Sequence, residues 1–378
     1  MPVTALINAA VMTPAGVVDG QALLVEDGII LSLVDRAEIP AGALVEDLAG
    51  GLLVPGFIDT QVNGGGGVLF NDAPTVETIA AIGAAHRPFG TTGFLPTLIS
   101  DDLEVVDAAM RATEAAIEAG VPGVLGVHIE GPFLNAQRKG IHDADKFRVL
   151  DEAAIRLLSS LKRGKTLVTL APETTTPDMV RRLADAGVVV AAGHTNAAYE
   201  TVKAALEAGL TGFTHLFNAM SPLTSRAPGT VGAALENQRA WCGIIVDGRH
   251  VDPATLRIAL RTRPLDRFML VTDAMPTVGM ADKRFVLQGQ AITVQDGVCV
   301  GPGGTLAGSD LDMIGAVRNA VDMLGLSLQD AVMIASAAPA AFLGLAAQRG
   351  TIAPGMAADL VLLDDQRNVV RTWIDGRG

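Results

Sequence analysis

Four residues suited to hydrolytic chemistry stand at the ends of short apolar runs in this chain. Glu130 closes VLGVHIE, His194 closes VVVAAGH, and His215 follows Gly-Phe-Thr in GFTHLF. A carboxylate and two imidazoles that meet in space can bind one divalent metal ion. Asp273 ends a fourth run, FMLVTD, and a carboxylate there could take a proton from a water molecule beside the metal. These residues predict a metal-dependent hydrolase if the fold brings them together.

Each of these residues also has an ordinary structural interpretation. A single histidine after an apolar run is more often a structural residue than a ligand. Asp273 stands shortly before Pro276 and could cap the next segment. The combination favours the metal site, because side chains from three different strands would rarely face one cavity by chance.

Eight apolar runs, each ending in polar residues, follow one another from Leu53 onward: LLVPGFID, GFLPTLI, VLGVHIE, TLVTLAPE, VVVAAGH, GFTHLF, GIIVDG and FMLVTD. Helices are predicted between most of them, at Val76–His86, Leu103–Glu118, Ala153–Leu161 and Thr201–Ala208. Eight such units predict a closed (β/α)8 barrel of the TIM type, with functional residues at the C-terminal ends of its strands. A doubly wound open sheet is the alternative, but it would not gather functional residues from so many strands.

The two ends of the chain have a different, strand-like pattern. Asp27-Gly28 between two apolar runs predicts a hairpin near the N-terminus. Ala358–Leu363 and Val369–Ile374 predict strands near the C-terminus. We therefore expect a small β-sandwich domain built from residues 1–52 and 348–378.

The barrel domain is then expected over residues 53–347. A β insertion near 284–304 interrupts its last unit, around Asp296-Gly297.

Composition narrows the class of protein further. The chain has 378 residues, a formal net charge of −13 and 49% hydrophobic residues. This acidity disfavours nucleic acid and anionic membranes as partners. Two cysteines provide no disulfide framework, which favours the cytoplasm. No signal peptide and no run long enough to span a bilayer are recognisable, so we expect a cytoplasmic enzyme with a small-molecule substrate.

The first predicted barrel strand argues for a single metal ion. It carries Gln61 and Asn63 after Asp59, and neutral amides are weak zinc ligands. The glycine run at 64–67 lacks the spacing of a phosphate-binding loop, so a flexible turn is the better interpretation.

Several cationic or titratable residues lie close to predicted strand ends in this acidic chain. They are His142, Arg226 and the pair Arg249-His250, each of which alone is most simply a loop residue. Together with backbone N–H groups at Asn218-Ala219, they could form a pocket for an anion.

Long blocks of the sequence resemble the N-acetylglucosamine-6-phosphate deacetylases of the amidohydrolase superfamily. In chain order these are PGFIDTQVNGGGG, GTTGFLPTLIS, HIEGPFLNAQRKGIHD, AGHTNA, THLFNAMSPLTSRAPG, GIIVDGRHVD, LVTDAM and LAGSDLDM. GTIAPGMAADLVLLD is similar to the superfamily's return strand into the small β domain. HIEGPFLN and THLFNAM are specific to the deacetylases.

The resemblance implies a role for each matching residue. Glu130, His194 and His215 match the metal ligands, and Asp273 matches the catalytic acid and base. His142 matches a residue at the acetyl carbonyl. The other residues expected around the substrate are Gln61, Asn63, Ile141, Asn218, Ala219, Arg226, His250, Leu306, Ala307 and Gly308. Most amidohydrolases have His-x-His on the first strand, where this chain has Gln61-Val62-Asn63, which again favours one metal.

The resemblance implies hydrolysis of N-acetyl-D-glucosamine 6-phosphate to glucosamine 6-phosphate and acetate, in amino-sugar catabolism or recycling. Zinc is the expected metal, with iron(II) as the alternative, and a homodimer is the expected assembly. The alternatives are a deacetylase of the galactosamine epimer, another amidohydrolase of N-acyl compounds, or a barrel scaffold without catalysis.

Overall fold

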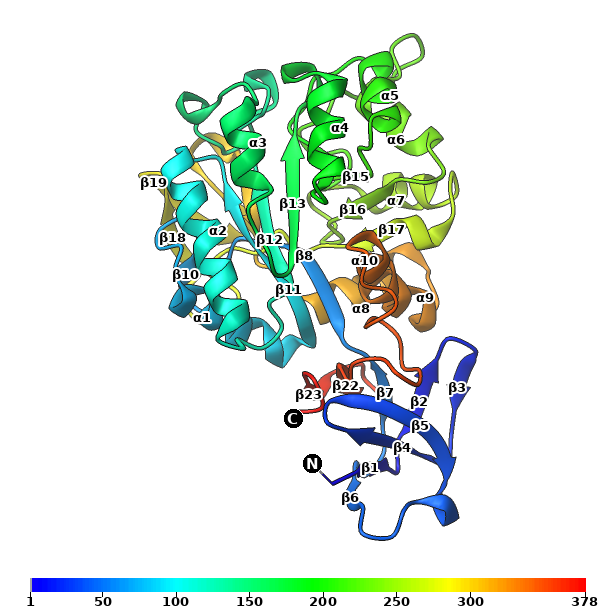
Figure 1. Cartoon of the computed structure of the whole chain (residues 1–378). Helices are drawn as coiled ribbons and strands as arrows, with labels where there is room; N and C mark the ends of the chain where they lie inside the picture. The colour runs from blue at the N-terminus through cyan, green and yellow to red at the C-terminus, as the bar shows by residue number, and fades with distance from the viewer. Residues whose placement is uncertain (1) are drawn as a thin grey trace.

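The computed structural model describes residues 2–378, and at its centre is an eight-stranded parallel sheet curled into a barrel (Figure 1). Neighbouring strands pair in chain order, and every ladder is parallel. Each predicted apolar run contributes one strand to the barrel, so the predicted fold class is confirmed. The strands are β8 (Phe57–Val62), β11 (Thr91–Ile99), β12 (Gly126–Glu130), β13 (Lys165–Leu170), β14 (Val189–Ala192), β15 (Gly212–Phe213), β16 (Trp241–Ile244) and β17 (Phe268–Leu270).

The barrel closes where the first and last strands end. The N–H of Asp273 donates to the carbonyl of Gln61 at 3.0 Å, and the N–H of Asn63 donates to the carbonyl of Ala274 at 2.9 Å. Val62 and Ala274 form an isolated parallel bridge at the same level. This seam therefore places the amide side chains of the first strand beside Asp273.

Helices surround the barrel and cover its outer face (Figure 1). The predicted limits of α1 and α2 are confirmed, whereas α3 and α5 differ from prediction by one to three residues at each end. Side chains of Thr75, Asp151 and Thr176 cap α1, α3 and α4, which stabilises those helix starts. The helices are α1 (Val76–His86), α2 (Leu103–Glu118), α3 (Glu152–Leu158), α4 (Pro177–Asp185), α5 (Tyr199–Glu207), α6 (Gly229–Glu236), α7 (Pro253–Leu260), α8 (Met313–Leu324), α9 (Leu328–Ala335) and α10 (Ala337–Phe342).

Two small sheets built from both ends of the chain lie beside the barrel (Figure 1). The predicted hairpin at Asp27-Gly28 joins β4 to β5, and both turn residues have positive φ. Leu23, Leu53 and Trp373 belong to the apolar core of this part. One sheet has the order β5 (Ile29–Asp35), β4 (Gln21–Glu26), β1 (Thr4–Ile7), β6 (Leu44–Asp47); the other has β23 (Val369–Trp373), β22 (Leu360–Leu363), β7 (Leu52–Pro55), β2 (Ala10–Thr13), β3 (Gly16–Val18).

The first predicted barrel run is divided between the two parts of the molecule. Leu52–Pro55 forms β7 and pairs with β22 in the small sheet, whereas the barrel strand β8 begins at Phe57. Gly56 lies between them, and a Cβ there would stand 2.1 Å from Thr92 Oγ1. Only glycine fits this closely packed position, where the chain passes from β7 of the small sheet to β8 of the barrel. The division of the chain at 52/53 and 347/348 stays a prediction.

The predicted insertion is a four-stranded antiparallel sheet that reaches the C-terminal ends of the barrel strands. Its strands are β18 (Arg284–Leu287), β19 (Gln290–Gln295), β20 (Val298–Val300) and β21 (Leu306–Ser309). Ser309 exchanges backbone hydrogen bonds with Asp273 and Met275. Ile292 and Ala307 pack in one apolar cluster with Ile99 and Met275, so the insertion forms one wall over the strand ends.

The remaining elements are short. β9 (Gly64–Gly65) and β10 (Val68–Leu69) form a two-stranded sheet after β8. Single 3₁₀ turns lie at η1 (Arg36–Glu38), η2 (Arg87–Phe89), η3 (Ala136–Arg138), η4 (Ala144–Lys146), η5 (Pro172–Thr174), η6 (Leu265–Arg267) and η7 (Pro302–Gly304). Within residues 2–378, no helix combines the length and apolar character that crossing a bilayer requires.

Candidate active site

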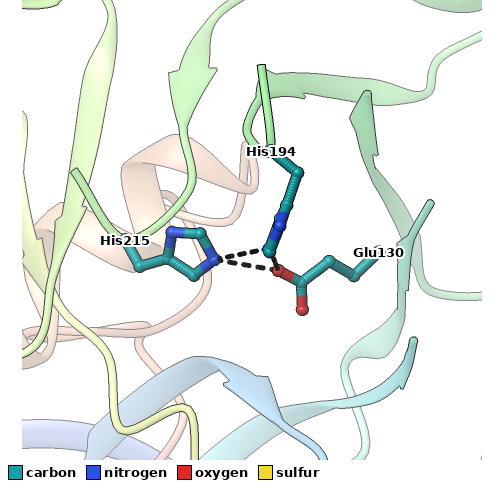
Figure 2. Close-up of side chains that lie close together, drawn as sticks. All are labelled: Glu130, His194 and His215. Atoms are coloured by element: carbon teal, nitrogen blue, oxygen red, sulfur yellow. Dashed lines mark hydrogen bonds and ion pairs between the residues drawn. The ribbon is translucent and has the colours of Figure 1, made fainter. Parts of the chain in front are cut away.

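The three predicted metal ligands meet at the C-terminal end of the barrel (Figure 2). Glu130 is the last residue of β12, and His194 and His215 each follow the end of their strand by two residues. The Nε2 atoms of the histidines lie 3.1 and 3.0 Å from the same Glu130 oxygen and 3.1 Å from each other. All three side chains are buried. The structure thus brings together the residues that the sequence suggested.

Left-handed backbone conformations orient two of these side chains and that of Asp273. His194, His215 and Asp273 have φ values of 48°, 31° and 53°. Residues other than glycine rarely adopt positive φ, and such conformations concentrate at functional sites. Each one turns the chain immediately after a barrel strand, so that the side chain points across the strand end.

The donor set fits a divalent metal ion. His194 Nδ1 lies 2.9 Å from the carbonyl of Arg138, so this nitrogen carries the proton and Nε2 presents its lone pair to the site. Burial alone would raise the pKa of Glu130, but the close approach of the His194 and His215 rings to its carboxylate holds that pKa well below its usual value. An ionised carboxylate and two imidazoles that converge at this distance match a His₂Glu ligand set. A cation here would be held by Glu130, His194 and His215.

Asp273 stands beside this centre and is linked to it by Gln61. One carboxylate oxygen of Asp273 accepts hydrogen bonds from Asn63 Nδ2 at 2.7 Å and from Gln61 Nε2 at 3.2 Å. The same Gln61 nitrogen lies 3.2 Å from Glu130 Oε2. Burial and the nearby charge of Glu130 raise the pKa of Asp273 to about 6. A carboxylate with a pKa near neutrality can both accept and return a proton at physiological pH.

His142 is arranged as a neutral hydrogen-bond donor. Its Nδ1 accepts from the N–H of Ser100 at 3.3 Å and lies 2.8 Å from the Ser100 hydroxyl. The ring proton therefore belongs on Nε2. Burial and the neighbouring His194 hold the pKa of His142 well below its usual value, which keeps the ring uncharged. A buried N–H beside the candidate metal site is suited to a carbonyl oxygen on which negative charge develops.

A cavity of about 340 Å³ contains these groups. Most of the predicted site residues lie on its wall. Four predicted residues do not line it in the described structure: Gln61 and Asn63 are buried and hydrogen-bonded to Asp273, Ala307 is fully buried, and Arg226 is exposed on a loop. The predicted residues on the wall are Glu130, Ile141, His142, His194, His215, Asn218, Ala219, His250, Asp273, Leu306 and Gly308.

On one side of the cavity, the ring of His250 is held in place by Asp247. His250 Nδ1 lies 2.5 Å from Asp247 Oδ2, and Asp247 also accepts the N–H of His250. Although burial opposes it, the bond from His250 lowers the pKa of Asp247, so this carboxylate is ionised and fixes the ring. His250 Nε2 is then left for a ligand in the cavity.

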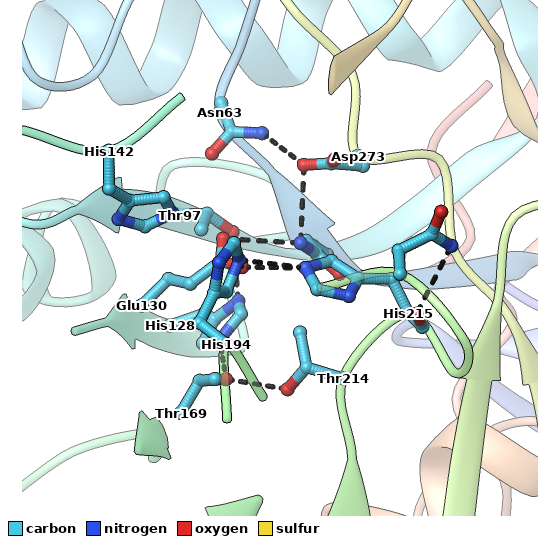
Figure 3. A network of polar contacts seen from close by, with 12 residues as sticks. Asn63, Thr97, His128, Glu130, His142, Thr169, His194, Thr214, His215 and Asp273 are labelled. Carbon is cyan, nitrogen blue, oxygen red and sulfur yellow. Dashed lines mark hydrogen bonds and ion pairs between the residues drawn. The ribbon is translucent and has the colours of Figure 1, made fainter. Parts of the chain in front are cut away.

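A buried polar network below the candidate metal ligands was not predicted from the sequence (Figure 3). His128 Nε2 lies 2.7 Å from Thr169 Oγ1, which lies 2.6 Å from Thr214 Oγ1, and His128 Nδ1 lies 3.3 Å from Thr97 Oγ1. Burial lowers the pKa of His128 to about 4, so the ring is neutral. Strand alternation offered a signal, because His128 is two residues before Glu130 and must share its inward face. Gln137 and Arg138, also on the cavity wall, come from a loop without such periodicity.

Comparisons with known proteins agree with this geometry. The chain matches the amidohydrolase family over residues 52–377. It is 45% identical to the N-acetylgalactosamine-6-phosphate deacetylase of Shewanella sp. (strain ANA-3), an alignment that covers 98% of this chain and 94% of the relative. It is 34% identical to the N-acetylglucosamine-6-phosphate deacetylase of Haemophilus influenzae, over 99% of this chain and 98% of that protein.

The structural comparison covers the same length. The crystal structure of N-acetylglucosamine-6-phosphate deacetylase from Pasteurella multocida superposes with a TM-score of 0.95 at 34% identity, over 99% of both chains. Sequence, fold and site thus lead to one conclusion: the chain belongs to the amidohydrolase family, together with these sugar-phosphate deacetylases.

Proposed function

We propose that this chain hydrolyses the acetamide of N-acetyl-D-glucosamine 6-phosphate, giving glucosamine 6-phosphate and acetate in amino-sugar metabolism. The observation that carries the proposal is the meeting of Glu130, His194 and His215 with Asp273 and His142 in one buried cavity. Relatives over nearly the full length are named as deacetylases of hexosamine 6-phosphates. A scaffold without catalysis would have no reason to keep this set of groups together.

A divalent ion, for which zinc is our proposal, would supply Lewis acidity that polarises the amide carbonyl and makes water more acidic. The ionised Asp273 accepts the proton of the attacking water. His142 donates its Nε2–H to the carbonyl oxygen as charge develops there. Asp273 then returns the proton to the nitrogen of the departing amino sugar, so that acetic acid and a neutral amine form. The acid then gives up its proton to the amine or to solvent, which leaves acetate.

The remaining predicted residues hold the sugar and its phosphate. We assign His250 and the backbone at Asn218-Ala219 to the phosphate, because they share the cavity wall with the metal centre. The segment Leu306–Gly308, supplied by the insertion, would border the sugar. Arg226 is exposed and outside the wall, so its guanidinium would reach the phosphate only by loop movement or from a second copy of the chain in the homodimer that we propose.

N-acetyl-D-galactosamine 6-phosphate is a second candidate substrate. The relative named for that substrate is 45% identical, against 34% for the H. influenzae glucosamine enzyme. The two sugars differ only in the configuration at C4, far from the amide, so the same catalytic groups would serve both.

An acetate-release assay on both epimers, with and without the 6-phosphate, tests the proposal. We expect turnover of at least one phosphorylated epimer and poor turnover of the unphosphorylated sugars. Comparison of kcat/KM between the two phosphates assigns the preferred epimer. A metal-loaded protein that releases acetate from neither phosphate would refute the function.

We place the reaction in the cytoplasm, in keeping with the two free thiols, Cys242 and Cys299.

A further inference from the structure

Asp59 is a buried carboxylate that no step above uses. It lies on β8, two residues before Gln61, and its exposed fraction is 0%. Its Oδ2 accepts a hydrogen bond of 2.5 Å from the hydroxyl of Thr272. Its Oδ1 accepts from the N–H groups of Gln61 at 3.1 Å and Thr272 at 3.3 Å. Asp59 therefore connects the first barrel strand to the residue immediately before Asp273.

We propose that Asp59 and Thr272 form a clasp across the barrel seam that positions Asp273 for proton transfer. Asp59 is then a positioning residue, which acts through Thr272 on the carboxylate next to it. The inference rests on the proposed function, since it needs the hydrolysis in which Asp273 moves a proton. Neither Asp59 nor Thr272 lines the cavity among the described residues, so neither is expected to touch the substrate.

The seam explains why such a clasp is needed. In the sheet order, β8 and β17 are the two edge strands, so no ladder joins them within residues 2–378. On the far side of Asp273, the backbone of Ala274 is held by Val62 and Asn63. On the near side, the clasp to Thr272 joins the bond from the Asp273 N–H to the Gln61 carbonyl and is the side-chain attachment across the seam. Asp273 has a φ of 53° between these two anchors, a conformation that costs energy and must be imposed by its neighbours.

The fold alone does not account for a carboxylate at this position. No cation is paired with Asp59 among the described residues, and burial raises the pKa of Asp59 to about 7. One strand away, the neutral hydroxyl of Thr97 accepts the N–H of Val62 at 2.9 Å, at no such cost. A two-headed side chain such as a carboxylate, unlike a hydroxyl, can bond the Thr272 hydroxyl with one polar atom and two backbone N–H groups with the other. That capacity is what fixing both sides of the seam requires.

The test is Thr272→Val, which removes the hydroxyl with little change in shape. Displacing a reacting group by about 1 Å can cost on the order of 10²-fold in rate, so we expect kcat to fall by roughly ten- to a hundredfold. KM and the metal content should stay at wild-type values, because the clasp lies outside the cavity. Thr272→Ser keeps the hydroxyl and should restore most of kcat. Asp59→Asn should also keep most of it, since the amide can still accept at Oδ1 and donate to the Thr272 oxygen.

Thr113→Val is the matched control. Thr113 is equally buried, and its hydroxyl donates to the carbonyl of Ala109 within α2 at 2.9 Å, away from the site. Both valine variants should lower the melting temperature, but only Thr272→Val should lower kcat. The clasp is refuted if Thr272→Val keeps wild-type kcat per bound metal, if its loss appears in KM, or if Thr272→Ser or Asp59→Asn loses as much as Thr272→Val. A wild-type protein with no turnover of any hexosamine phosphate would refute the proposed function instead.

Discussion

Replacing Asn63 by Ala should move the pH dependence of the reaction while leaving its maximum nearly unchanged. Asn63 supplies the shorter of the two hydrogen bonds to Asp273, 2.7 Å against 3.2 Å from Gln61. This bond favours the ionised carboxylate and so lowers the pKa of Asp273, which burial and Glu130 raise to about 6. Without it the pKa rises further. A metal ion at the site would stabilise the ionised form in both proteins, so its effect would cancel in the comparison.

The size of the shift follows from the energy of the bond. A hydrogen bond to a charged group contributes about 1.5–3 kcal/mol, and one pKa unit corresponds to about 1.4 kcal/mol. The apparent pKa on the acid side of the kcat/KM profile should therefore rise by about one to two pH units. In the proposed reaction Asp273 works as a base, so activity is present above its pKa and is lost as the pH falls through it. At about pH 6 the variant should lose about five- to fiftyfold in activity, and it should approach wild type near pH 9.

The assay is acetate release at low substrate concentration from about pH 5 to about pH 9, with metal content measured on each sample. The plateau at high pH is the internal control for folding and metal loading. A variant with an unmoved acid limb would mean that Asn63 does not tune Asp273. An equal loss at every pH would mean that Asn63 acts on substrate binding, the role suggested by resemblance.

Three further predictions concern the metal, the base and the phosphate. Elemental analysis should find about one equivalent of divalent metal per chain, because Gln61 and Asn63 offer amides where a second ion would need imidazoles; two equivalents would contradict this. Asp273→Asn should keep the fold and the metal but lose on the order of 10²–10⁴-fold in kcat, since the amide cannot accept a proton; wild-type turnover would move the base elsewhere. Arg226→Ala should lower kcat/KM for the 6-phosphate by about ten- to a hundredfold while sparing the unphosphorylated sugar; an equal fall on both would make Arg226 a structural residue.

The fold could be predicted from the sequence because a parallel barrel produces a regular pattern of apolar runs and helices. Strands buried on both faces appear as apolar runs, and helices between them appear at 3.6-residue spacing. Since every strand of a barrel ends at the same face, residues that follow the runs must approach one another. Glu130, His194, His215 and Asp273 were found by this rule alone, although 143 positions separate the first from the last.

The features that escaped prediction depend on packing between distant segments. Gln61 and Asn63 are recognisable as amides, but their bonds to Asp273 exist only because the barrel closes across more than 200 residues. Gly56 looks like any residue inside an apolar run until Thr92 is seen against it. The position of Arg226 was also not readable from the sequence, because a cation close in sequence to the site lies on an exposed loop outside the cavity wall.

The most direct test of metal-dependent deacetylation is acetate release from N-acetyl-D-glucosamine 6-phosphate and its galactosamine epimer by one preparation in three states. These are the protein as purified, the protein after removal of metal by a chelator, and the same protein after addition of one equivalent of zinc. The structure predicts turnover in the first state, its loss in the second and its return in the third, with the melting temperature falling and recovering in parallel. Acetate release at an undiminished rate from the metal-free protein, or none from the zinc-loaded protein on either epimer, would contradict the account.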